Sequence, residues 1–265
     1  MVINMEWTQA IHDHVASLQP VSITKALLQR LFSLLDLTSL NESDNNDTIA
    51  AFFEKANSVY GHVAAVCIYP RFVRLAVTQF AGSPIKVATV VNFPEGSSSL
   101  SDVLIEINQA LEDGAQEIDM VFPYSRYLAG EQQYSRDFIS ACRAACGAKA
   151  VLKVILETGA LGDSVIIADA CYAAMMAGAD FVKTSTGKIA QGATLEAAAA
   201  MLLVIKHARA QLKHEVGLKV SGGIRDIQQA AQYMQLLENM MGSAWITPHT
   251  FRIGASQLVN EILAQ

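Results

Sequence analysis

The segment that decides the fold runs from Val151 to Gly187 and reads VLKVILETGALGDSVIIADACYAAMMAGADFVKTSTG. It opens on a short run rich in β-branched residues and closes on another, so both ends are predicted strands. Between them, Ser164–Met176 carries apolar residues at helical spacing. A strand, a helix and a strand in succession form a βαβ unit, whose strands pair in parallel through a right-handed crossover.

The same alternation continues toward both ends of the chain and gives eight strands with intervening helices. The predicted strands lie in LLDLTSL (from Leu34), VAAVCIYP (from Val63), KVATVVNFP (from Lys86), EIDMVFP (from Glu117), KAVLKVILET (from Lys149), DFVKTSTG (from Asp180), GLKVSGG (from Gly217) and FRIGAS (from Phe251). The predicted helices include Asp47–Ser58, Leu100–Glu112, Ser164–Met176, Leu195–Leu212 and Ile227–Met241. Eight such units favour a single (β/α)₈ TIM barrel. An open doubly wound sheet is the alternative, but no GxGxxG follows the first strand.

Length and composition agree with one soluble domain. The chain has 265 residues, of which 52% are hydrophobic and 17% charged, with a net charge of −6. We expect a barrel over residues 34–265 and an N-terminal helical cap over the barrel bottom in residues 1–33. The acidic balance argues against nucleic-acid binding. The four cysteines show neither a disulfide framework nor a zinc pattern, so we expect no metal. Without a signal peptide or membrane span, the sequence predicts a cytoplasmic protein.

Several predicted strands carry ionisable residues on the face that should point into the barrel. Strand alternation places Lys183, Lys219, Asp119 and Asp36 inside, together with Lys153 and Glu157. Isolated charges there would be very costly, so these groups must pair, shift their pKa or become neutral.

Two interpretations of this cluster remain open at this point. The first is a structural network in which Lys153 pairs with Glu157 and Lys219 with Asp119. The second is amine catalysis, in which burial and the ammonium of Lys219 on the next strand leave Lys183 neutral enough to attack a carbonyl. Asp119 would then act as a proton relay through Lys219 or water.

Glycine-containing loops follow the last three predicted strands, in TSTGK, VSGG and IGAS. The phosphate site of such barrels is usually built from the last βα-loops, where glycine lets backbone N–H groups approach phosphate oxygens. Ser256 stands where an N-cap would open the last helix. Lys188 and Arg225 would add positive charge. The alternative is that these glycines only make tight turns.

These segments together resemble the deoxyribose-phosphate aldolase family. The resemblance rests on LLDLTSLN (from Leu34), AVCIYPRF (from Ala65), EIDMVFP (from Glu117), LKVILETG (from Leu152), AGADF (from Ala177), VKTSTGK (from Val182), LKVSGGIR (from Leu218) and FRIGAS (from Phe251). It implies a class I, cofactor-independent lyase that reversibly cleaves 2-deoxy-D-ribose 5-phosphate to acetaldehyde and D-glyceraldehyde 3-phosphate. Homodimers are common in the family, although no dimer surface can be read from the sequence.

The resemblance also implies a role for individual residues. Lys183 is the expected Schiff-base lysine, Lys219 the lysine that lowers its pKa, and Asp119 the proton-relay acid. Asp36 is an expected substrate-hydroxyl contact. The expected phosphate contacts are Gly187, Lys188, Gly222, Gly223 and Ser256.

The sequence departs from the family pattern at three points. The motif from Lys219 reads KVSGG where KPAGG is more usual, and Gln257 stands where a second phosphate-facing serine is common. The chain ends at Gln265 without the tyrosine-bearing tail of some members, so water or the Lys219–Asp119 pair would protonate the enamine. Two rival functions share the barrel: a Schiff-base enzyme for another phosphosugar or a thiolytic acyl donor, and a catalytically silent phosphosugar sensor.

Overall fold

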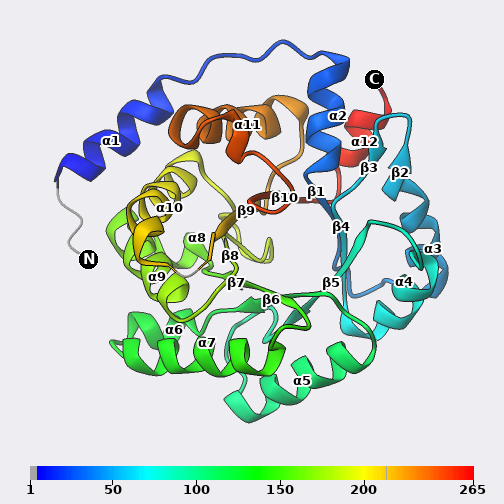
Figure 1. Cartoon of the computed structure of the whole chain (residues 1–265), viewed down its shortest axis with the longest axis horizontal. Coiled ribbons are helices and arrows are strands. Elements are labelled where there is room, and N and C mark those ends of the chain that lie inside the picture. The colour runs from blue at the N-terminus through cyan, green and yellow to red at the C-terminus, as the bar shows by residue number, and fades with distance from the viewer. Residues whose placement is uncertain (1–4, 213) are drawn as a thin grey trace.

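The computed structural model, which describes residues 5–212 and 214–265, is a closed barrel of eight parallel strands surrounded by helices (Figure 1). Neighbouring strands follow chain order around the barrel, and β10 closes it by pairing with β1. The barrel strands are β1 (Leu35–Ser39), β4 (Ala65–Ile68), β5 (Lys86–Val91), β6 (Glu117–Val121), β7 (Val151–Ile155), β8 (Phe181–Lys183), β9 (Gly217–Ser221) and β10 (Phe251–Ala255). The prediction of a (β/α)₈ barrel is confirmed.

Helices cover the outside of the barrel. They are α1 (Met5–Ala16), α2 (Lys25–Ser33), α3 (Asn46–Phe53), α4 (Val73–Gln79), α5 (Leu100–Glu112), α6 (Tyr124–Leu128), α7 (Gln132–Cys146), α8 (Thr158–Leu161), α9 (Ser164–Met176), α10 (Leu195–Ala208), α11 (Ile227–Met241) and α12 (Leu258–Leu263). In the described part of the chain, none of these is long and apolar enough to cross a membrane.

Local capping explains why the long helices begin where the apolar periodicity predicts. The side chains of Ser99, Asp163, Thr194 and Asp226 precede α5, α9, α10 and α11, and each accepts a hydrogen bond from a backbone N–H in the first turn. Such caps satisfy N–H groups that have no partner within the helix. For α5, α9 and α11 the structure matches the predicted bounds residue for residue.

Two predicted helices end earlier than expected. The segment after α3 continues as a 3₁₀ turn, Glu54–Ala56, and then forms a short antiparallel hairpin of β2 (Asn57–Ser58) and β3 (Gly61–His62). Likewise α10 gives way at Arg209–Gln211 to a 3₁₀ turn. Apolar spacing continues through these turns, so the sequence pattern does not mark the change.

The N-terminal segment is helical, as predicted, but it does not lie across the barrel bottom. Helix α1 packs against α10 and α11, and Figure 1 shows it beside the barrel at the outer edge. Trp7 meets His207 of α10 edge to face, with 5.6 Å between the ring centroids. Helix α2 packs against β3, α11 and α12. The expected cap is therefore corrected to a lateral position; residues 1–4 of the predicted segment lie outside the described residues.

Candidate active site

Seven ionisable side chains fill the interior of the barrel, and none of them is more than 5% exposed. We call this set the buried charge network; it comprises Asp36, Glu117, Asp119, Lys153, Lys183, Lys219 and Arg252. They come from β1, β6, β7, β8, β9 and β10, so the network exists only when the barrel is closed. Among the residues the structure describes, no buried side-chain nitrogen or oxygen lacks a hydrogen-bond partner.

The two lysines on neighbouring strands meet at one carboxylate. Lys183 and Lys219 are register partners across β8 and β9. The Nζ of Lys183 lies 2.8 Å from Oδ2 of Asp119, and the Nζ of Lys219 lies 2.7 Å from the same oxygen. The structure thus brings together the three side chains expected to be catalytic, and it confirms the expected Lys219–Asp119 pair.

A second carboxylate and a third lysine complete the contacts around Asp119. Lys153 donates to Oδ1 of Asp119 at 2.9 Å and to Oδ2 of Asp36 at 3.2 Å, and Lys219 donates to the same Asp36 oxygen at 2.5 Å. Lys153 also lies 2.5 Å from Glu117. The expected pairing of Lys153 with Glu157 is wrong, because these nearer carboxylates occupy its ammonium.

The network has four basic groups but only three carboxylates, so with every group ionised it would hold one excess positive charge. Burial lowers the pKa of Lys183; Asp119 opposes this change and the ammonium of Lys219 adds to it. For Lys219, burial alone would lower the pKa, but Asp119 and Asp36 raise it above its usual range. Lys183 is therefore the basic group from which a proton leaves most easily.

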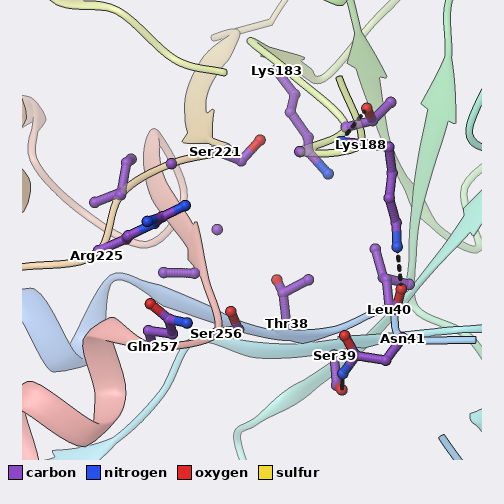
Figure 2. A pocket seen from close by; sticks show the side chains of 17 residues that line it. Thr38, Ser39, Leu40, Asn41, Lys183, Lys188, Ser221, Arg225, Ser256 and Gln257 are labelled. Carbon is purple, nitrogen blue, oxygen red and sulfur yellow. Dashed lines mark hydrogen bonds between the residues drawn. The ribbon is translucent and has the colours of Figure 1, made fainter. Parts of the chain in front are cut away.

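Lys183 is also the one member of the network that lines the cavity at the carboxyl ends of the strands. This cavity has a volume of about 250 Å³, and Figure 2 shows the Lys183 side chain projecting into it. The rest of its lining comes from Thr38, Ser39, Leu40, Asn41, Thr186, Gly187, Lys188, Ser221, Gly222, Gly223, Ile224, Arg225, Gly254, Ala255, Ser256 and Gln257. None of these described lining residues is acidic, so the cavity suits a small anionic ligand.

All five expected phosphate contacts line this cavity, whereas Asp36 lies beneath it. The loops after β8 and β9 approach each other closely: a Cβ on Gly222, whose φ is +87°, would lie 3.3 Å from the Cα of Gly187. Only glycine combines this backbone conformation with such an approach. Lys188 reaches across the mouth and donates to the Leu40 carbonyl at 2.5 Å (Figure 2).

Ser256 does not cap the last helix as expected. Helix α12 begins at Leu258, its N-cap is Gln257, and that side chain makes no capping hydrogen bond. Ser256 is exposed and faces the cavity, with Gln257 and Arg225 on the same side (Figure 2). The Ser256 hydroxyl therefore remains available to a ligand, and the helix that follows it, α12, has only 6 residues.

Glu157 has a different role from the expected ion pair. It is fully buried with a φ of +54°, a strained conformation for a residue with a side chain. Its carboxyl group accepts hydrogen bonds from the backbone N–H of Thr186, at 3.3 Å, and from the Thr186 hydroxyl. Burial raises the pKa of Glu157. The residue thus fixes the loop that presents Gly187 and Lys188 to the cavity.

Glu117 and Arg252 belong to the buried charge network but were not among the inward-facing residues predicted from the sequence. Both stand in the quoted motifs EIDMVFP and FRIGAS. Alternation from Asp119 places Glu117 on the inner face, and register with Lys219 does the same for Arg252. Strand alternation alone could therefore have identified Glu117, whereas the inward position of Arg252 follows from the pairing of β9 with β10.

Gly254 leaves the space that the Lys219 side chain occupies. A Cβ at this position would lie 2.9 Å from the Cβ of Ser221 and 3.1 Å from Cε of Lys219. We expect Gly254→Ala to displace Lys219, to lower kcat at least tenfold and to destabilise the fold by about 1–3 kcal/mol through overpacking. Steady-state kinetics normalised to folded protein, together with urea unfolding, measure both effects. Unchanged kcat with an unchanged unfolding midpoint would contradict this role.

The side chains that could bind a metal ion do not form such a site in the part of the chain that the structure describes. Within residues 5–212 and 214–265, no group of three His, Cys, Asp or Glu side chains is arranged to hold a metal ion. The carboxylates of Asp36 and Asp119 are already bound by lysine and arginine.

Comparisons with known proteins identify the family of the chain. The family described as DeoC/LacD family aldolase matches residues 31–244. A protein from Coccidioides immitis, assigned as a deoxyribose-phosphate aldolase, is 31% identical over 98% of both chains, with a TM-score of 0.76. One from Toxoplasma gondii with the same assignment is 27% identical over 91% of this chain and 95% of its own, with a TM-score of 0.82.

A more distant structure shares the fold. The tetrameric deoxyribose phosphate aldolase from Aeropyrum pernix is 24% identical over 99% of this chain and 97% of its own, with a TM-score of 0.71. The match of the family over most of the chain, together with the lysine-centred barrel interior, shows that this protein belongs to the DeoC/LacD family of aldolases.

Proposed function

We propose that the protein is a class I aldolase that reversibly cleaves 2-deoxy-D-ribose 5-phosphate to acetaldehyde and D-glyceraldehyde 3-phosphate. It acts without a cofactor in the cytoplasm, in carbohydrate degradation that consumes the sugar of deoxyribonucleotides. The observation that carries the proposal is the Lys183 amine, which lies at the floor of a cationic cavity and has its pKa lowered by burial. The similar proteins named above support the choice of substrate.

The reaction begins when the neutral Nζ of Lys183 attacks the aldehyde carbon C1 of the sugar. Protonation of the carbinolamine hydroxyl and loss of water then give an iminium ion, which withdraws electrons from C2. The C3 hydroxyl then loses its proton, the C2–C3 bond breaks, and glyceraldehyde 3-phosphate leaves with the C3 carbonyl. The electron pair of that bond remains as an enamine on Lys183. Protonation at C2 and hydrolysis release acetaldehyde.

Proton transfer in these steps is assigned to the Asp119–Lys219 pair. Asp119 Oδ2 accepts hydrogen bonds from both Lys183 and Lys219, so this carboxylate can take the proton that leaves Lys183, and the Lys219 ammonium can donate one in a later step. Asp36 holds Lys219 from the opposite side. Its contact with a substrate hydroxyl stays a prediction, since Lys153, Lys219 and Arg252 bind its oxygens in this structure.

A coupled assay for glyceraldehyde 3-phosphate, combined with borohydride trapping, tests the proposal. We expect deoxyribose 5-phosphate to release glyceraldehyde 3-phosphate, and borohydride to add the reduced adduct to the Lys183 peptide. Ribulose and fructose phosphates serve as the comparison substrates. Faster cleavage of either, or trapping at Lys153 or Lys219, would overturn the proposal. Binding of deoxyribose 5-phosphate without product release would instead identify a sensor.

Replacing Lys188 should weaken phosphate recognition without impairing the chemistry. The cavity holds its ammonium near the glycine loops, where one charge-assisted hydrogen bond is worth about 1.5–3 kcal/mol. We expect Lys188→Ala to raise KM for deoxyribose 5-phosphate about 10- to 100-fold while kcat changes little. Unphosphorylated 2-deoxyribose is the matched control, and its kcat/KM should stay as in the parent. Equal losses on both sugars would refute a phosphate role.

A further inference from the structure

The interior of the barrel continues below Lys183 to an ion pair at the opposite end. Arg252 of β10 and Glu117 of β6 are 5% and 2% exposed. The guanidinium Nη2 donates to Oε1 of Glu117 at 2.9 Å, and Nη1 donates to Oδ1 of Asp36 at 2.5 Å. The Arg252 Nε donates to the Pro248 carbonyl, and its guanidinium lies 5.7 Å from the Phe181 ring centroid. The arginine is thus fixed on four sides.

This pair connects to Lys183 through an unbroken series of short contacts. Arg252 takes one oxygen of Asp36, which leaves the other to Lys219 at 2.5 Å. Lys219 then reaches the Asp119 oxygen that also accepts from Lys183. On the other side Glu117 binds Lys153 at 2.5 Å, and Lys153 binds the second Asp119 oxygen at 2.9 Å. Both routes end on Asp119.

The pair lies outside the lining of the cavity that contains Lys183. Arg252 and Glu117 line a second cavity of about 800 Å³ at the N-terminal ends of the strands, and the lining of the substrate cavity includes neither of them. Any effect of these residues on catalysis must therefore pass through the network.

We propose that Arg252 and Glu117 are positioning residues that hold Asp36 and Lys153 in place beneath Asp119 and balance the charge of the barrel interior against the amine of Lys183. This inference rests on the proposed aldolase function. A purely structural role would not depend on the sign of the charge, but Arg252 is cationic, Glu117 is anionic, and both contact other members of the buried charge network. Removing either one changes the number of fixed charges around Lys183, and the two removals do so in opposite directions.

The titratable groups that act on Lys183 come from several strands. Asp119 of β6 contacts it, Lys219 of β9 is its register partner, and the Cys67 thiol of β4 lies 3.9 Å from the same Asp119 oxygen. Glu157, after β7, interacts with it as a weaker neighbour. Without Arg252 the network keeps three carboxylates and two other fixed cations, which favours the protonated form of Lys183. Without Glu117 it has an excess of cations, which favours the neutral amine.

The pH dependence of kcat/KM distinguishes this role from a structural one. The acid limb of this pH profile reports the loss of the proton from Lys183. We expect Arg252→Gln to move the acid limb to higher pH by about one unit and Glu117→Gln to move it to lower pH by about one unit, because one buried charge is removed in each case. The double variant, which removes both charges, should return the limb to the parent position with a lower kcat. As the matched control, Arg74→Gln removes a surface cation whose side chain is 77% exposed, and it should leave the limb in place.

The inference would be overturned if both single variants lost activity while their acid limbs stayed at the parent position. It would also be overturned if the acid limbs of the two variants moved in the same direction. If either single variant fails to fold, Arg252→Lys provides the test, because it keeps the charge but cannot bind Asp36 and Glu117 as a fork. Its limb should match the parent while kcat falls at least tenfold; an unchanged kcat would contradict the positioning role.

Borohydride trapping of the parent protein separates failure of this inference from failure of the proposed function. If deoxyribose 5-phosphate gives no adduct on Lys183 in the parent, the aldolase proposal itself is wrong. If the parent forms that adduct and the variants keep its pH profile, only the role of Arg252 and Glu117 is wrong.

Discussion

Replacing Lys183 with methionine should abolish aldol cleavage, with kcat/KM for deoxyribose 5-phosphate reduced at least about 10⁴-fold. Methionine keeps most of the volume of the lysine stem but has no amine, so neither the carbinolamine nor the iminium ion can form. Because Asp119 keeps its contacts to Lys153 and Lys219, the carboxylate is not left unpaired and the barrel should fold.

Two measurements accompany this variant. Borohydride should add no substrate mass to Lys183→Met, whereas the Lys188→Ala control should still be trapped on Lys183 when substrate is saturating. A circular dichroism spectrum and a melting temperature close to those of the parent show that the barrel is intact. Activity above about 1% of the parent in a folded Lys183→Met protein would contradict a Schiff base at this residue.

Replacing Lys219 with methionine should cost about three orders of magnitude in kcat/KM near neutral pH and move the acid limb of the profile upward. The ammonium of Lys219 helps to lower the pKa of Lys183, while burial remains the larger cause. Without it Lys183 holds its proton to higher pH, so fewer molecules carry the neutral amine. Asp36 and Asp119 also each lose a hydrogen bond.

Lys219→Arg is the informative companion, because it keeps a positive charge beside Lys183 with a different shape. We expect its acid limb to stay near that of the parent while kcat falls, and raised pH should partly restore Lys219→Met but not Lys219→Arg. An acid limb that stays at the parent position in Lys219→Met would show that this ammonium does not control the proton on Lys183.

The barrel and its inner charges were predictable because strand alternation is a strong signal where one face must be apolar. A lysine or aspartate in the middle of such a run stands out, which is how Lys183, Lys219, Asp119 and Asp36 were identified. The glycine-containing loops that line the cavity were also predictable, since they follow consecutive strands in the sequence, whereas their role in phosphate binding stays a prediction.

What could not be predicted depends on contacts between strands. Lys153 is the register partner of Asp119 across β7 and β6, so its ammonium reaches Asp119 and Glu117 instead of Glu157. Arg252 lies at a strand start, where its contact with Asp36 becomes visible only once β10 pairs with β1. The lateral position of α1 depends on side-chain packing against α10 and has no local sequence signal.

The most direct test is the protonation of Lys183 itself, measured by NMR on protein labelled with ¹³C at the lysine ε-carbon. The Lys183 signal is assigned by its absence in Lys183→Arg. We predict that this signal titrates below the ordinary lysine pKa of about 10.4, with a measurable neutral fraction where the enzyme is active. A Lys183 signal that titrates at or above the ordinary value would contradict the account.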